Sequence, residues 1–184
     1  MKRKENLEII KKGLIIVDMI NGFVKEGTLA DPNIAGIIPE IERLALMYLE
    51  NEDKVFAFKD CHTLDSPELN NFPVHCMKGT NEVELVDELR KYEDQFTVFE
   101  KNSTSGIFVP EFFDYIKKMK NLTELVITGC CTDICIMNLA IPLKNFFNQI
   151  NRNVNIIVPE NAVDTYNITG VHDRDEWNEM AYRF

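Results

Sequence analysis

The sequence contains no long hydrophobic run. No apolar stretch reaches the roughly 18 residues that a membrane-spanning helix needs. The charged N-terminal stretch, MKRKENLEIIKKG, also lacks the apolar centre of a signal peptide. Both absences predict a soluble, cytoplasmic protein that has no membrane partner and whose thiols stay reduced.

Basic residues and repeats are scarce as well. The chain of 184 residues has 30 acidic and 20 basic side chains, which gives a formal net charge of −10. Beyond the N-terminal stretch no segment is rich in lysine or arginine, so we expect no nucleic-acid partner, because binding to a phosphate backbone depends on such cations. No repeat or low-complexity tract divides the chain, and 45% of its residues are hydrophobic. One domain over residues 1–184 is therefore predicted.

Cysteine is also rare, and three of the five cysteines fall in one stretch, VITGCCTDIC, from Val126 to Cys135. An odd number of cysteines in a reducing compartment argues against a disulfide framework. The C-C-x-x-x-C spacing, with no second pair nearby, does not fit a tetrahedral zinc knot. Two interpretations of the stretch remain open, a set of inert buried thiols and a reactive nucleophile.

What the sequence does contain is a series of short apolar runs. Five of them have the length and β-branched content of buried strands, at residues 13–18, 54–60, 95–101, 124–129 and 154–160. Helical periodicity lies between them, at residues 36–51 and 110–120. Alternating strands and helices of this kind predict an α/β fold with a mainly parallel sheet covered by helices on both faces. A later helix contains Pro142, which we expect to kink it or to end its first half.

The first four runs each lead into reactive side chains. These are Asp18, Asp60 with His62 just beyond it, Lys101, and the cysteine stretch. Because the carboxyl ends of parallel strands meet at one edge of a sheet, these residues are predicted to share a crevice there. The alternative for each charged residue is that it simply leaves a strand for solvent.

Cys135 is the candidate nucleophile of the cysteine stretch. Gly129 permits a tight turn after the fourth strand, and Thr132 is expected to cap the next helix, which places Cys135 at its third position. The free N–H groups and the dipole at that helix end would favour a thiolate and hold an oxyanion formed nearby. Cys130 and Cys131 fit better as small buried hydrophobic residues.

Three motifs together resemble those of the isochorismatase-like cysteine hydrolases, namely IIVDMINGF, FEKNSTSGIF and VITGCCTDIC. The resemblance runs from Leu14 to about Met180 and implies a three-layer α/β/α, Rossmann-like fold. It also implies a catalytic triad, an oxyanion hole of backbone N–H groups, and a cis peptide between Cys130 and Cys131. The implied triad is Asp18, Lys101 and Cys135, and the oxyanion hole would use the N–H groups of Cys131 and Cys135.

The chemistry of these three side chains suits amide hydrolysis. Asp18 can accept the thiol proton of Cys135 and later return it to the leaving amine. Lys101 can hold the carboxylate and stabilise the charged forms. The sulfur would attack an amide carbonyl, and hydrolysis of the resulting thioester would complete the reaction.

The segment KDCHTLDSPELNNFPVHCMKGT holds two of the three histidines. Two imidazoles and two carboxylates, from Asp60, His62, Glu68 and His75, form a donor set that suits Zn²⁺, Mn²⁺ or Fe²⁺. The alternative is that both histidines only form hydrogen bonds within loops. The pattern D-x-H followed by F-P-x-H-C-x-x-G-T is similar to the metal loop of nicotinamidases. This resemblance implies one divalent metal ion, Zn²⁺ before Mn²⁺ or Fe²⁺, with Glu68 rather than Asp65 as a ligand.

The resemblance to nicotinamidases also implies a substrate and a pocket. Nicotinamide would be hydrolysed to nicotinate and ammonia in NAD salvage, with its ring nitrogen on the metal and with Phe23, Phe72 and Phe108 as aromatic walls. Ordinary core packing is the alternative for each phenylalanine. Two other functions stay open, hydrolysis of another small amide and a non-catalytic binding or thiol-redox role. A homo-oligomer stays open too, and His172 is expected at the surface or at a helix cap, without a chemical role.

Overall fold

A computed structural model describes residues 7–183 of the chain, and its centre is a six-stranded sheet. The strands are β1 (Lys12–Val17), β2 (Lys54–Asp60), β3 (Thr97–Lys101), β4 (Glu124–Cys130), β5 (Asn155–Ile157) and β6 (Val163–Asp164). Five of them follow the order β3-β2-β1-β4-β5, and β6 pairs with the last residues of β4. All of these pairings are parallel. The predicted α/β fold with a central parallel sheet is confirmed.

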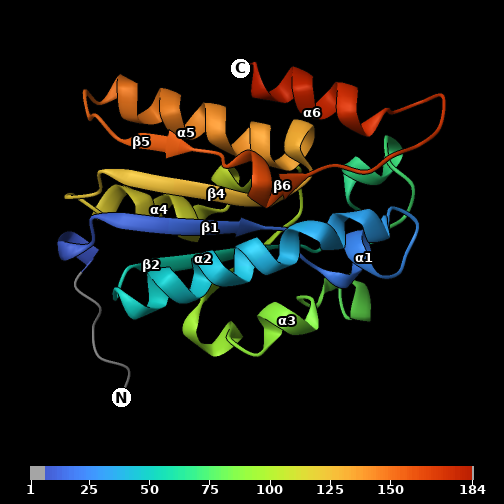
Figure 1. The fold of residues 1–184 in the computed structure, drawn as a ribbon, viewed down its shortest axis with the longest axis horizontal. Helices are drawn as coiled ribbons and strands as arrows, with labels where there is room; N and C mark the ends of the chain where they lie inside the picture. Colours follow the sequence, from blue (N-terminus) through green and yellow to red (C-terminus); the bar gives the residue numbers. More distant parts are fainter. Residues whose placement is uncertain (1–6, 184) are drawn as a thin grey trace.

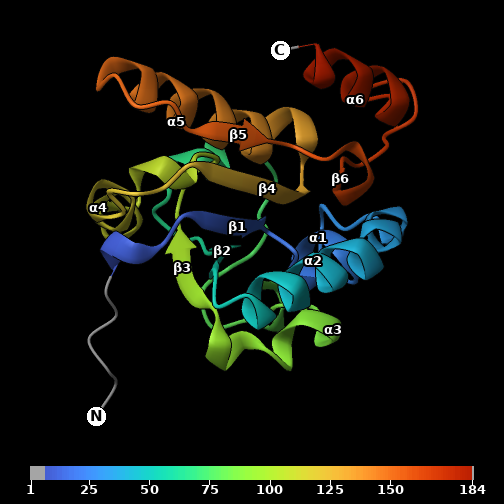
Figure 2. The same cartoon turned by 60° about the vertical axis from the view of Figure 1, so that its left-hand side comes forward.

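Helices cover both faces of this sheet (Figure 1, Figure 2). On one face lie α1 (Asn21–Val24), α2 (Ile38–Glu50) and α3 (Asp87–Arg90). On the other face lie α4 (Pro110–Lys118) and α5 (Met137–Gln149). The last helix, α6 (Arg174–Tyr182), packs against a single π-helical turn, Thr132–Ile136, which we call the cysteine turn. The described chain therefore has the three layers that the family resemblance implied.

Successive residues of β1 point into two separate cores. Leu14 and Ile16 pack on the side of α1 and α2, whereas Ile15 and Val17 pack on the side of α4 and α5. A strand that is buried on both faces produces this alternation. Within residues 7–183, no helix is both long enough and apolar enough to span a membrane. Residues 1–6, the charged start of the N-terminal stretch, lie outside the described part.

Two elements late in the chain differ from the prediction. The strand predicted at 154–160 shortens to β5, because Pro159 has no N–H to donate and precedes the 3₁₀ turn Glu160–Ala162. The chain then forms β6, which the sequence analysis missed. The helix that contains Pro142 does not end there, and α5 runs through it. The carbonyl oxygen of Asn138, which a proline four residues later leaves without a donor, accepts a hydrogen bond from Ser105 Oγ at 2.7 Å.

The carboxyl ends of β1 to β4 meet at one edge of the sheet and bring the candidate residues together. Asp18 follows β1, and Asp60 and Lys101 are register partners at the ends of β2 and β3. Gly129 lets β4 approach β1 closely at this edge. Its φ is 113°, and a Cβ atom at this position would lie 2.0 Å from the carbonyl oxygen of Val17. Only glycine fits there.

Candidate active site

Asp18, Lys101 and Cys135 lie in contact at the carboxyl edge of the sheet. Lys101 Nζ is 2.8 Å from Asp18 Oδ2 and 3.7 Å from Cys135 Sγ. The three residues are 0%, 2% and 6% exposed, in the order Asp18, Lys101, Cys135. Asp18 has a left-handed backbone conformation, with a φ of 53°. Such a conformation is uncommon outside glycine and is found more often at functional sites.

Burial and charge set the protonation of this triad. Burial raises the pKa of Asp18 to about 6, although the Lys101 ammonium opposes the shift. Burial also raises the pKa of the Cys135 thiol well above its usual value. Burial opposes the charged form of Lys101, but the carboxylates of Asp18 and Asp60 outweigh it and raise the Lys101 pKa. The resting triad near neutral pH is therefore a carboxylate, an ammonium and a neutral thiol.

The structure corrects two predictions about the cysteine turn. Its N-cap residue is Cys131, no side chain caps it, and Thr132 is its first residue. Thr132 therefore does not act as the cap, and Cys135 is the fourth residue of the turn rather than the third. The end of the turn does not produce a resting thiolate either, because burial raises the pKa of the Cys135 thiol more than the Lys101 ammonium lowers it. The cis peptide between Cys130 and Cys131 is present, as the resemblance implied.

The five cysteines are all buried, free thiols. The prediction that the chain has no disulfide framework is confirmed. Among the described residues, one group of potential metal donors lies close together, and it contains no cysteine.

That group of metal donors lies beside the triad. Asp60, His62, Glu68 and His75 each offer one ligand atom, and these four atoms lie within 4.8 Å of one another. Asp60 Oδ2 is 3.0 Å from His62 Nε2 and 3.3 Å from His75 Nε2. Glu68 Oε1 is 3.9 Å from His62 Nε2. Asp65, the other carboxylate considered, is exposed and does not belong to the group.

Outer contacts orient the two imidazoles toward the centre of this cluster. His62 Nδ1 is 2.9 Å from the side-chain oxygen of Asn102, and His75 Nδ1 is 2.7 Å from the carbonyl oxygen of Pro73. Both oxygens are acceptors, so each Nδ1 can donate its hydrogen to one of them, and each Nε2, which faces the cluster, is then the atom available to a metal. This tautomer is the one that a metal ligand requires. The residues present therefore fit a divalent ion such as Zn²⁺.

Sequence reasoning missed the residues of this outer layer. Besides Asn102, the backbone N–H of Thr104 donates a hydrogen bond to the second oxygen of Glu68, at 3.0 Å. Both residues belong to the stretch KNSTSG that begins at the end of β3. The position of this polar stretch directly after Lys101 was a signal that could have identified them.

Asp60 connects the metal donors to the triad. Its Oδ1 accepts a hydrogen bond from Lys101 Nζ at 3.0 Å, while its Oδ2 faces His62 and His75. Burial opposes the charged form of Asp60, but Lys101 and the two histidines outweigh it and hold its pKa well below the usual range. A charged carboxylate is therefore shared by both clusters at neutral pH.

Residues 12–184, which are most of the chain, match the isochorismatase domain family. The chain belongs to this family. It is 35% identical over 142 residues to Nicotinamidase 1 of Arabidopsis thaliana, an alignment that covers 68% of this chain and 57% of that protein. The chain thus spans little more than half the length of that relative.

Solved structures of this family share the fold. The crystal structure of a nicotinamidase from Bacillus subtilis is 30% identical, with a TM-score of 0.80 and coverage of 95% of this chain and 93% of that one. N-carbamoylsarcosine amidase from Thermoplasma acidophilum is 28% identical, with a TM-score of 0.74 and coverage of 95% and 92%. The protein is an isochorismatase-family hydrolase whose relatives include nicotinamidases.

Two of the three expected aromatic walls of this isochorismatase-family site lie against the metal donors. The ring centroids of Phe23 and Phe72 are 5.9 Å and 6.2 Å from that of His75. Phe108 is instead 76% exposed. It ends the 3₁₀ turn Gly106–Phe108, in which its neighbour Ile107 takes the core position. The structure therefore places Phe108 at the surface rather than in a closed wall.

The prediction for His172 is wrong. Its side chain is buried rather than at the surface, and its Nε2 lies 3.0 Å from Asp133 Oδ2, in the cysteine turn. Its hydrogen-bond partner Asp133 lies far away in the sequence. The residues next to His172 in the sequence therefore gave no indication that its side chain is buried.

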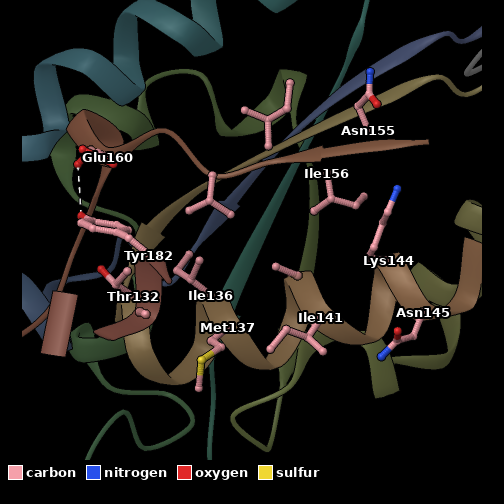
Figure 3. Close-up of a pocket in the computed structure, with 14 residues that line it drawn as sticks. Thr132, Ile136, Met137, Ile141, Lys144, Asn145, Asn155, Ile156, Glu160 and Tyr182 are labelled. Carbon is pink, nitrogen blue, oxygen red and sulfur yellow. Dashed lines mark hydrogen bonds between the residues drawn. The ribbon is translucent and has the colours of Figure 1, made fainter. Parts of the chain in front are cut away.

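A groove of about 640 Å³ lies apart from both clusters, between α5, β5 and the end of α6 (Figure 3). Met137 and Ile141 of α5 and Ile156 of β5 line it, with Thr132 at one end beside Tyr182. Neither the triad nor the four metal donors line it. The reactive groups therefore lie outside this groove.

Proposed function

We propose that this hydrolase converts nicotinamide to nicotinate and ammonia, in NAD salvage in the cytoplasm, with one divalent metal ion, Zn²⁺ by preference, and a thioester on Cys135. One observation carries the proposal. Four metal donors adjoin a buried cysteine triad and share Asp60 with its Lys101. The similarity to nicotinamidases of Arabidopsis thaliana and Bacillus subtilis supports the same substrate.

The four metal donors serve to bind and orient the substrate. Asp60, His62, Glu68 and His75 would hold a divalent ion, which would supply Lewis-acid chemistry for a ring nitrogen of the substrate. The rings of Phe23 and Phe72 hold the flat pyridine. A ring held in this way directs its carboxamide toward Cys135, and positioning of this kind lowers the barrier to attack.

Asp18 acts as the base in the first half of the reaction. Because the Cys135 thiol is neutral at rest and Asp18 is a carboxylate, the thiol proton moves to Asp18 as sulfur attacks the carboxamide carbon. The backbone N–H groups of Cys131 and Cys135 hold the oxyanion, and Lys101 stabilises the ionised groups around it. Asp18 then returns the proton to the leaving nitrogen. The C–N bond breaks, ammonia departs, and the acyl group remains on Cys135 as a thioester.

The same groups complete the reaction with water. Asp18, again a carboxylate, takes a proton from a water molecule that attacks the thioester carbon. The C–S bond breaks, the Cys135 sulfur takes the proton back from Asp18, and the product leaves as nicotinic acid, which loses its proton to solvent and becomes nicotinate. The triad returns to the carboxylate, ammonium and thiol of the resting state.

Ammonia release from nicotinamide tests this proposal. Metal-replete protein is compared with a Cys135→Ala variant and with chelator-treated protein before and after Zn²⁺ is added back. We expect turnover to be lost in the variant, lost on chelation and restored by Zn²⁺. Absence of turnover by the metal-replete protein would refute the nicotinamidase assignment, and turnover by Cys135→Ala would refute the nucleophile.

Hydrolysis of a carbamoyl compound is a second candidate function. It is favoured by the similarity to N-carbamoylsarcosine amidase, at 28% identity over 95% of this chain. The triad could attack a carbamoyl carbon without any ring nitrogen on a metal. Ammonia release from N-carbamoylsarcosine that persists after chelation would favour this candidate. Turnover of neither substrate by a protein with a reactive Cys135 would favour a non-catalytic thiol role.

A further inference from the structure

Three aromatic rings form a stack beside the cysteine turn. The His172 imidazole lies between Tyr166 and Trp177, with centroid distances of 4.2 Å and 4.9 Å and interplanar angles of 28° and 4°. Tyr166 and His172 belong to the loop between β6 and α6, and Trp177 belongs to α6. Because β6 pairs with the end of β4, this loop starts at the edge of the sheet where the cysteine turn begins.

Both ring nitrogens of His172 have hydrogen-bond partners. Nδ1 is 2.9 Å from the carbonyl oxygen of Tyr166, and Nε2 is 3.0 Å from Asp133 Oδ2. A carbonyl and a carboxylate are both acceptors, so a neutral imidazole donates to one of them and a doubly protonated ring donates to both. The two hydrogen bonds and the two stacked rings together fix the position and the plane of the imidazole.

Asp133 lies in the cysteine turn, two residues before Cys135. Its side chain is buried, and its Oδ1 has no hydrogen-bond partner. Among the described residues, only the His172 side chain forms a side-chain hydrogen bond with this carboxylate. A buried carboxylate with a single donor depends strongly on that donor. Because the turn also lacks a side-chain N-cap, the bond to His172 anchors it from outside.

Tyr166 brings the same stack close to the reactive cysteines. Burial raises the pKa of its hydroxyl to about 12, and the nearby Asp133 carboxylate adds to the shift. Tyr166 also packs against the buried cluster that contains Cys131, whose backbone N–H belongs to the proposed oxyanion hole. The stack therefore lies next to the groups that the reaction uses, and a displacement of the stack would reach them.

We propose that His172 is a positioning residue for the hydrolytic reaction. Acting through Asp133, it holds the cysteine turn so that the Cys135 thiol and the backbone N–H groups of the turn keep the geometry for attack. His172 itself contacts neither the thiol nor the substrate. The inference rests on the proposed role of Cys135 as the nucleophile and does not depend on nicotinamide as the substrate.

A double-mutant cycle of His172→Gln and Asp133→Asn tests the inference. We expect each single variant to lose on the order of 10- to 100-fold in kcat, because small displacements of a reacting atom cost this much. KM should change little, since the substrate contacts are untouched. The double variant should be no slower than the slower single variant, because His172 acts only through Asp133. Losses that simply add in the double variant would overturn the proposal.

Asp164→Asn is the matched control for general loosening of α6. The buried Asp164 carboxylate accepts hydrogen bonds from Arg174 Nε at 2.7 Å and from Asn178 at 3.0 Å, so it holds α6, and no side-chain hydrogen bond of the described residues joins it to Asp133. We expect this variant to lower the Tm and to leave kcat unchanged. A loss of kcat equal to that of His172→Gln, at an equal loss of Tm, would show that His172 has only a structural role.

A second readout separates this inference from the proposed substrate. The alkylation rate of Cys135 is measured in the same variants by mass spectrometry of the peptide that contains it. We expect slower, non-additive alkylation in His172→Gln and Asp133→Asn, because a displaced thiol loses its alignment with Asp18. Unchanged alkylation in both variants would overturn the inference. Absence of nicotinamide turnover by the native protein would overturn the proposed function alone.

Discussion

Lys101→Met is expected to destabilise the protein strongly, and the size of the effect follows from its contacts. Lys101 Nζ lies between the carboxylates of Asp18 and Asp60, at 2.8 Å and 3.0 Å, and all three side chains are at most 2% exposed. Methionine keeps the apolar stem but removes the charge, which leaves two buried carboxylates without their cation. Removal of one partner from a buried ion pair costs about 3–5 kcal/mol. For a chain of this size, that corresponds to a fall in Tm of about 6–20 °C.

The loss should depend on pH in a defined direction. The Lys101 pKa lies well above its usual value, so the charged ammonium contributes fully at every pH below that value. In the variant, the pKa of Asp18, already about 6 in the native protein, rises further. The deficit in the free energy of unfolding is therefore largest above pH 6 and shrinks as the pH falls and the carboxyl groups become neutral.

Lys59→Met in the adjoining part of β2 provides the matched control. Lys59 Nζ pairs with Glu93 at 3.1 Å and Glu84 at 3.7 Å, and these carboxylates stay 28% and 39% exposed. Water can solvate them after the change, so we expect a loss of only about 0–1 kcal/mol. Thermal unfolding of both variants, in chelator at pH 5 and pH 8, measures the difference. The reasoning would be refuted if Lys101→Met lost no more free energy of unfolding than Lys59→Met. It would also be refuted if the loss for Lys101→Met were the same at both pH values.

Three further predictions concern the metal, the base and the sheet. Asn102→Ala, which removes the acceptor that orients one imidazole, should weaken Zn²⁺ binding by about 10- to 100-fold in a competition titration, and unchanged affinity would contradict the assigned tautomer. The kcat/KM for amide hydrolysis should fall as the pH drops below about 6, because protonation of Asp18 removes the base, and a flat profile from pH 5 to pH 7 would exclude that role. Gly129→Ala should prevent folding or lower the Tm severely, because its Cβ atom would lie 2.0 Å from a carbonyl oxygen of β1. The control is Gly79→Ala, because Gly79 also has a positive φ but a Cβ atom there would have nothing within 4 Å, so this variant should stay folded. If Gly79→Ala and Gly129→Ala lost soluble protein to the same extent, the steric argument would be contradicted.

The arrangement of the strands was largely readable from the sequence, because strands buried on both faces leave continuous apolar runs. Each of the first four runs corresponds to a strand within two residues, and the reactive residue at each end follows from the same pattern. The sequence motifs also named Asp60, His62, Glu68 and His75 as metal donors, and the structure brings their ligand atoms together.

Other features were out of reach of pattern reasoning because they depend on contacts between distant segments. The burial of His172 depends on Asp133, 39 residues earlier, and on two aromatic rings at irregular spacing. The exposure of Phe108 depends on which of two adjacent hydrophobic residues, Ile107 or Phe108, the short turn directs inward. The raised pKa of Cys135 reflects the depth of burial, which a position near a helix end does not reveal.

The strand order explains why residues so far apart in the sequence form one site. The chain runs outward from β1 through β2 to β3, then crosses back to place β4 on the other side of β1. The crevice at such a reversal lies between β1 and β4, which are the strands that lead to Asp18 and the cysteine turn. Lys101 and Asp60 follow on β3 and β2, so four adjacent strands, about 4.8 Å apart, each contribute one part of the site. The distance from the nucleophile to the metal donors is therefore set largely by the register of the sheet, and the loop residues Glu68 and His75 only complete a geometry that the strands impose.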